Sequence, residues 1–108
     1  MGAPELCTRL TLINARGLHA RASAKFIAVV NSYDVHVTVQ SHNDAYEDKV
    51  VADSIMELLM LGAACGEDIT ICARGVEASA ALAALTQLAQ NRFHDEEEAA
   101  PNSENKGP

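Results

Sequence analysis

A histidine flanked by two arginines is the group in this sequence best suited to chemistry. Residues 16–21 read Arg-Gly-Leu-His-Ala-Arg, so His19 lies between Arg16 and Arg21. Neutral imidazole is a nucleophile at physiological pH, and arginine binds phosphate oxygens through charge-assisted hydrogen bonds. The three residue types together predict transient phosphorylation of His19. The competing interpretation is an ordinary surface histidine in a turn.

The position of His19 strengthens the first interpretation, because a helix should begin there. Small and apolar residues recur at helical spacing over 19–31, in a stripe of Ala20, Ala24, Ile27 and Val30 widened by Phe26. Histidine is a poor helix N-cap, and a broken local rule is typical of a functional site. The first turn of a helix carries unpaired N–H groups and a partial positive charge, which predicts an anion site at His19.

The remaining elements are predicted from hydrophobic periodicity. Period-two alternation indicates strands over 6–13, 35–40 and 69–73, with a weaker strand within 45–51 and a turn over 41–44. In the first strand we expect the even positions to face inward. Helical spacing predicts a helix over 54–61 and another from about 76, with a stripe of Ala78, Ala81, Leu82, Leu85, Leu88, Ala89 and Phe93.

The order β-α-β-β-α-β-α predicts an α+β fold. Amphipathic strands favour an antiparallel sheet with one face exposed to water. We therefore expect a two-layer open-faced sandwich, in which a four-stranded antiparallel sheet is covered on one face by three helices. We expect a single domain over 1–94. The acidic segment 95–108 is too polar to bury a core, so we predict that it is a disordered tail.

Ser54 opens the second helix as part of a capping box with Glu57, and Gly62 should end that helix in a left-handed conformation. The apolar residues that follow Ser54 could be core or could leave a partly exposed docking patch. We expect both, with Ile55 or Met56 as the exposed member.

Charge and composition exclude several classes of protein. The net charge of −7 argues against a general nucleic-acid binder, which needs a basic face. No segment has the length of a membrane span or the apolar core of a signal peptide. Before Asp34, however, Glu5 is the only acid beside four basic residues, Arg9, Arg16, Arg21 and Lys25. A locally basic segment of this kind suits an anionic ligand or an acidic partner.

Neither a metal nor a cofactor is expected. His36, His42 and His94 have no partner at ligand spacing, and Cys7, Cys65 and Cys72 form no CxxC pair. The cysteines read as buried or free thiols, which makes the cytoplasm the expected compartment.

Two segments resemble the signatures of the HPr family, the histidine-containing phosphocarriers of the phosphotransferase system. Residues 17–26 are similar to the active-site signature and residues 53–62 to the second signature, and the similarity runs from about 8 to 93. The resemblance implies a carrier rather than an enzyme, and we expect a monomer without a cofactor. His19 would accept phosphate on Nδ1 from enzyme I, which phosphoenolpyruvate charges, and pass it to an enzyme IIA-type acceptor.

The resemblance also implies roles for other residues. Arg21 matches the phosphate-stabilising arginine, and Ser54 matches a serine that a dedicated kinase and phosphorylase regulate in some members. Arg16 is expected, from its place in the turn before His19, to be a further phosphate or partner contact. The family usually has proline and then alanine after the arginine, whereas this chain has Ala22 and Ser23. The change puts transfer rate or partner preference in doubt, since proline pre-sets the helix start. We expect partner docking at Ala22, Ser23, Ile55 and Met56.

Two alternatives stay open from the sequence. One is a regulatory binding module on the same fold without obligate phosphotransfer, which a similarity of residues 58–61 to the nitrogen-related, NPr-like branch makes plausible. The other is an acyl carrier protein modified on Ser54, because Asp53 to Ile55 is close to the Asp-Ser-Leu motif. Acyl carrier proteins are helical bundles, so the predicted strands argue against the second alternative.

Overall fold

The computed structural model describes residues 4–42 and 48–94. Its elements in chain order are β1 (Glu5–Thr11), α1 (Ala20–Asn31), β2 (His36–His42), β3 (Lys49–Val51), α2 (Ile55–Leu61), β4 (Asp68–Arg74), α3 (Ala78–Gln90) and a short 3₁₀ turn, η1 (Arg92–His94). The predicted order β-α-β-β-α-β-α is confirmed. The acidic tail predicted over 95–108 lies outside the described residues. Within the described ranges, no helix is both long and apolar enough to span a membrane.

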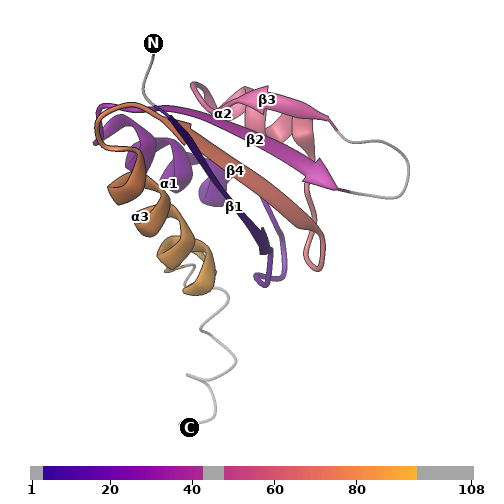
Figure 1. Cartoon of the computed structure of the whole chain (residues 1–108). Helices are drawn as coiled ribbons and strands as arrows, with labels where there is room; N and C mark the ends of the chain where they lie inside the picture. The colour runs from indigo at the N-terminus through magenta and orange to yellow at the C-terminus, as the bar shows by residue number, and fades with distance from the viewer. Residues whose placement is uncertain (1–3, 43–47, 95–108) are drawn as a thin grey trace, which may run out of the picture.

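The four strands form one antiparallel sheet in the order β1-β4-β2-β3. The helices cover one face of this sheet, and β4 runs through its middle between β1 and β2 (Figure 1). The predicted two-layer α+β sandwich is confirmed. An acyl carrier protein is a helical bundle, so the sheet contradicts that alternative for Ser54.

Aliphatic side chains between the sheet and the helices form the core. Alternate residues of the two central strands are almost completely buried, namely Val37, Val39, Ile69, Ile71 and Ala73. Burying a large aliphatic side chain stabilises a fold by about 1.5–3 kcal/mol, so this layer holds the helices on the sheet. The even positions of β1 lie opposite the buried residues of β4, as predicted. Leu6 nevertheless stays 40% exposed because β1 is an edge strand.

The buried stripe of α1 differs from the predicted one. Ala20 is exposed and Ala24 is only half-buried, whereas the core face is made by Ala22, Ser23, Phe26, Ile27 and Val30. These residues are three or four apart, so they also satisfy helical spacing. The sequence pattern was ambiguous here because alanine and serine are small enough to occupy either face.

Three predicted boundaries were wrong. The first strand, expected to run to residue 13, ends at Thr11. Ser41 and His42, expected in a turn over 41–44, instead pair with Ile69 and Asp68 and extend β2; residues 43–47 lie outside the described residues. The last helix ends at Gln90 rather than continuing to Phe93. Phe93 is buried as expected, but it reaches the core from a left-handed backbone in η1 (φ 58°).

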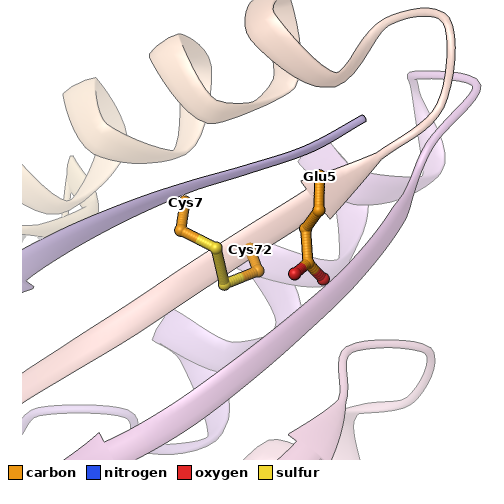
Figure 2. Close-up of side chains that lie close together, drawn as sticks. All are labelled: Glu5, Cys7 and Cys72. Carbon is orange, nitrogen blue, oxygen red and sulfur yellow. A yellow bond between two sulfur atoms is a disulfide. The ribbon is translucent and has the colours of Figure 1, made fainter. Parts of the chain in front are cut away.

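The cysteines also differ from expectation. Cys7 and Cys72 are directly opposite each other in β1 and β4 and are joined by a disulfide (Figure 2). Only Cys65 is a free thiol, and it is exposed. The prediction of three buried or free thiols was therefore wrong, because the pairing depends on strand register across 65 residues. The disulfide also removes the argument from free thiols for a cytoplasmic compartment.

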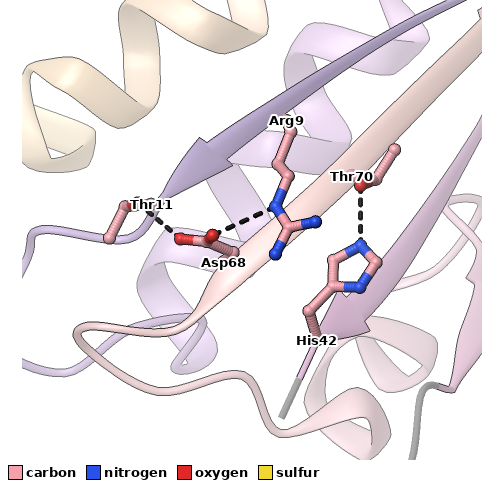
Figure 3. Close-up of polar contacts among 5 residues, drawn as sticks. All are labelled: Arg9, Thr11, His42, Asp68 and Thr70. Carbon is pink, nitrogen blue, oxygen red and sulfur yellow. Dashed lines mark hydrogen bonds and ion pairs between the residues drawn. The ribbon is translucent and has the colours of Figure 1, made fainter.

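Polar contacts on the helix-free face tie the end of β1 to β4. Asp68 accepts hydrogen bonds from the Thr11 hydroxyl and from the Arg9 Nε, the latter at 3.0 Å (Figure 3). The Thr11 hydroxyl and then the Arg9 guanidinium lower the pKa of the Asp68 carboxyl below its ordinary value. His42 Nε2 hydrogen-bonds Thr70 Oγ1 at 2.7 Å in the same region. The Asp68 contacts therefore hold the C-terminal end of β1, which precedes the segment with His19, against β4.

Candidate functional site

His19 is the N-cap residue of α1, so the predicted helix start is confirmed. Its backbone is extended (φ −80°, ψ −177°), and its carbonyl accepts the first helical hydrogen bond from the Ser23 N–H at 2.8 Å. Its ring Nδ1 accepts a hydrogen bond from the Arg21 N–H at 3.3 Å. The imidazole thus takes the place of the serine or aspartate oxygen that usually caps a helix. An acceptor Nδ1 carries a lone pair, so the proton of the neutral ring is on Nε2, which is buried.

The segment before His19 is fixed by its contacts with the chain that follows α2. Asn14 is fully buried, and its Nδ2 donates to the Gly17 carbonyl at 2.8 Å. Gly17 has a left-handed backbone (φ +61°), and a Cβ there would lie 2.4 Å from the Ala63 carbonyl oxygen. The next N–H, of Leu18, donates to that same oxygen at 3.0 Å. Only glycine permits both the backbone angle and the close approach, and together they set where α1 begins.

The surroundings of His19 favour negative charge. Arg16 and Arg21 are both exposed, three residues before and two residues after it. The first turn of α1 contains no acidic residue. The partial positive charge of a helix N-terminus therefore adds to the arginine charges instead of being neutralised by a carboxylate. This end of the helix can hold an anion such as a phosphoryl group.

Ser54 caps α2 as predicted. Its Oγ accepts a hydrogen bond from the Glu57 N–H at 3.2 Å, and Gly62 ends the helix in the left-handed conformation (φ 67°). The segment that follows, with Ala63, is the one that holds Gly17 and Leu18. The two signature segments of the sequence are thus joined through this contact.

Two of the four expected docking residues are placed differently. Ala22 and Ser23 are 1% and 0% exposed, so their side chains offer little surface to a partner in this structure. Both belong to the core face of α1, and Ser23 satisfies its hydroxyl by donating to the Leu18 carbonyl at 3.3 Å. Their effect on the site comes through the backbone of the first helical turn.

The other two docking residues belong to an exposed apolar patch on α2, which we define as Ile55, Met56 and Met60. Their exposed fractions are 39%, 62% and 72%. The exposure of Met60 was not predicted, although Met60 lies four residues after Met56 and so shares its face of the helix. The burial of Asn14 was not predicted either, because its only signal in the sequence is its place in a turn.

Comparison with known proteins decides the family. The family model of the phosphotransferase-system HPr component phosphorylation site matches residues 7–91. The chain belongs to the HPr family. This makes it a phosphocarrier of the phosphotransferase system, and the matched region includes both His19 and Ser54.

Relatives and solved structures agree with this membership. HPr of Pseudomonas aeruginosa is 39% identical over 88 residues, which are 82% of this chain and 94% of the relative. NPr of Shewanella violacea is 34% identical over 87 residues, which are 81% of this chain and 91% of the relative. The structure of HPr-C-His from Thermoanaerobacter tengcongensis has a TM-score of 0.74 at 29% identity and covers 83% of this chain and 97% of its own. The structure of HPr from Bacillus anthracis has a TM-score of 0.71 at 28% identity and covers 79% of this chain and 96% of its own. The HPr fold therefore extends over nearly all of the described chain.

We predict that Gly17→Ala will disturb the start of α1 in this HPr-family protein. The left-handed angle alone costs about 1–2 kcal/mol for a residue with a Cβ, and the contact with Ala63 adds to it. Gly66→Ala is the matched control, because Gly66 also has a positive φ (90°) but a Cβ at that position would have no atom within 4 Å. Urea unfolding should show a larger decrease in the free energy of unfolding for Gly17→Ala than for Gly66→Ala. Equal decreases would contradict the importance of the Ala63 contact.

Proposed function

We propose that His19 accepts a phosphoryl group on Nδ1 from enzyme I, itself charged by phosphoenolpyruvate, and passes it to an enzyme IIA-type acceptor. The observation that carries this proposal is the hydrogen bond from the Arg21 N–H to Nδ1. It directs the lone pair of Nδ1 toward the N-terminus of α1, where phosphoryl oxygens find N–H donors and positive charge. The protein is then a relay, not a catalyst with its own turnover.

The transfer step follows from this geometry. The Nδ1 lone pair forms the new N–P bond while the bond from phosphorus to the donor atom of enzyme I breaks and leaves its electron pair on that atom, and Nε2 keeps its proton throughout. The transferred group carries its negative charge on its outer oxygens. The Arg21 N–H, released from Nδ1, and the Arg21 guanidinium can bind those oxygens, with Arg16 as a further contact. The resulting N–P bond cleaves readily toward a second nucleophile, which suits a carrier.

Ala22 adds a donor that the usual proline lacks. Proline has no backbone N–H, whereas Ala22 at the third helical position retains one. Hydrogen bonds inside an α-helix do not use the N–H groups of its first turn. The Ala22 N–H therefore adds to the partial positive charge at the start of α1, which offsets the looser helix start that the loss of proline implies.

His19→Ala should abolish phosphorylation. The wild type is incubated with phosphoenolpyruvate and the cognate enzyme I, and its intact mass is measured. The mass should increase by one acid-labile phosphoryl group. Arg21→Ala should slow the step roughly tenfold or more, since a hydrogen bond to a charged group contributes about 1.5–3 kcal/mol. His36→Ala is the control, because His36 is an exposed histidine of β2. An unmodified wild type would contradict the relay and favour the regulatory binding module.

The apolar patch on α2 is the proposed docking surface for enzyme I and for the acceptor. Exposed methionines adapt to more than one partner, and a carrier must bind a donor and an acceptor in turn. The segment that ends α2 is hydrogen-bonded to the residues just before His19. A partner that covers the patch is therefore held at a fixed position relative to the imidazole.

Met60→Glu should lower kcat/KM for phosphorylation by enzyme I, by roughly tenfold if the contact contributes more than about 1 kcal/mol. Val76→Glu is the matched control, because Val76 is 82% exposed and lies next to Gly75, which contacts the segment after the far end of α1. Equal effects of the two substitutions would show that added charge, rather than loss of the patch, is responsible.

Ser54 is the proposed regulatory phosphorylation site, modified by a serine kinase and restored by a phosphorylase. It lies directly before Ile55 and Met56, so a phosphate there would place charge at the edge of the apolar patch. Asp53 and Glu57 lie beside Ser54, so a phosphate there would add to an existing negative charge. This charge would lie next to the docking surface on α2 and not on α1 beside His19.

Ser54→Asp and Ser54→Ala should separate the structural role of Ser54 from its regulatory role. Aspartate is as good an N-cap as serine, whereas alanine costs about 1 kcal/mol. We expect Ser54→Ala to be less stable in urea yet phosphorylated at the wild-type rate by enzyme I. Ser54→Asp should keep its stability and be phosphorylated more slowly. A wild-type rate for Ser54→Asp would argue against regulation at this position.

A further inference from the structure

Three side chains on the helix-free face of the sheet lie close enough to share a metal ion. They are Glu5, Cys7 and Cys72, and one ligand atom from each lies within 4.8 Å of the other two. Figure 2 shows the Glu5 carboxylate beside the two sulfur atoms, with Cys72 on β4 and the other two residues on β1. Among the described residues, this is the cluster that could hold a metal.

We propose that the reduced protein binds one zinc-like divalent ion through the Cys7 and Cys72 thiolates and the Glu5 carboxylate, and that the disulfide is the closed, metal-free state of the same site. Thiolates select soft or borderline ions over Mg²⁺ and Ca²⁺. Two cysteines and a carboxylate leave one position of a tetrahedral zinc open to water. The proposal is independent of phosphotransfer at His19.

Strand register places the three ligands on one face. Cys7 and Cys72 are direct partners, with their Cα atoms 4.0 Å apart. Glu5 precedes Cys7 by two residues, so both side chains leave β1 on the same side. Two thiolates on one tetrahedral zinc lie about 3.8 Å apart, given Zn–S bonds of about 2.3 Å. Small side-chain rotations are therefore enough to bring all three atoms around an ion once the disulfide opens.

The charges around the cluster are consistent with a site of moderate affinity. Two thiolates and a carboxylate carry three negative charges, which a divalent ion neutralises in part. No described residue forms a hydrogen bond or ion pair with the Glu5 carboxylate. Arg74 is the register partner of Glu5, and its positive charge repels a bound cation. The charge of Arg9, two residues after Cys7, is instead compensated by Asp68.

The chemistry of opening is a thiol–disulfide exchange. A dithiol reductant supplies two electrons and two protons, becoming a cyclic disulfide while Cys7 and Cys72 become thiols. Zinc binding then displaces the two thiol protons into solvent, and the Glu5 carboxylate coordinates without proton release. Oxidation by a disulfide of low molecular weight runs the sequence in reverse and expels the ion.

The test uses the full chain with Cys65→Ser, which removes the exposed free thiol. Zn²⁺ is titrated against a chromogenic chelator, with the protein either reduced and freed of reductant or fully oxidised. We expect one Zn²⁺ per reduced chain and none per oxidised chain, with loss of binding in Cys7→Ser and in Cys72→Ser. Glu5→Gln should weaken binding, because it replaces a charged carboxylate ligand by a neutral amide. Asp53→Asn is its control, since it removes one negative charge at an exposed position outside the sheet.

A second measurement keeps the test independent of folding. Urea unfolding followed by circular dichroism should show that Zn²⁺ raises the midpoint of the reduced protein and leaves the oxidised protein unchanged. Equal Zn²⁺ binding by the two redox forms would overturn the proposal, as would binding that survives Cys7→Ser or an affinity that Glu5→Gln leaves unchanged. A reduced protein that is unfolded or that takes up no Zn²⁺ would overturn it too, because the site depends on the intact register of β1 and β4.

Discussion

The contact between the Gly17 backbone and the Ala63 carbonyl is the constraint on which the functional end of this protein depends. A side chain at position 17 would collide with that oxygen, and the Leu18 N–H donates to the same atom. With the backbone held there, the chain enters α1 at a fixed angle and His19 becomes its N-cap. A histidine caps a helix poorly when it must compete with serine or aspartate. Here the neighbouring contacts fix the helix start, so the capping position is free to carry a nucleophile.

The same contact joins two surfaces that a carrier needs. His19 is at the start of α1, and the exposed apolar patch of Ile55, Met56 and Met60 is on α2. The segment after α2 ends at β4, the strand that pairs with both β1 and β2. His19 and the apolar patch are consequently positioned by two helices that pack against each other on one sheet. In the proposed relay, such an arrangement would set the orientation of the His19 ring before either partner binds.

The opposite face of the sheet is chemically different. It carries the disulfide, the Arg9–Asp68–Thr11 contacts and the His42–Thr70 hydrogen bond. Antiparallel sheets of this class leave one face in water, and the polar side chains there join the edge strand β1 to β4. The disulfide and these polar contacts therefore lie on the side of the sheet away from the helices and from His19.

The sequence by itself determined the features that local periodicity and local chemistry control. The alternation of Val37 and Val39 with polar residues, the helical stripe leading to Leu88, and the Ser54 cap each depend on neighbours within about one or two turns of chain. The placement of His19 at a helix start followed from the same local rules. Only the tertiary structure decided which small residues of α1 are buried, that Phe93 reaches the core from a left-handed turn, and that Met60 is exposed. It also decided that Cys7 faces Cys72, because strand register between segments 65 residues apart is set by the whole sheet and leaves no mark on either segment alone.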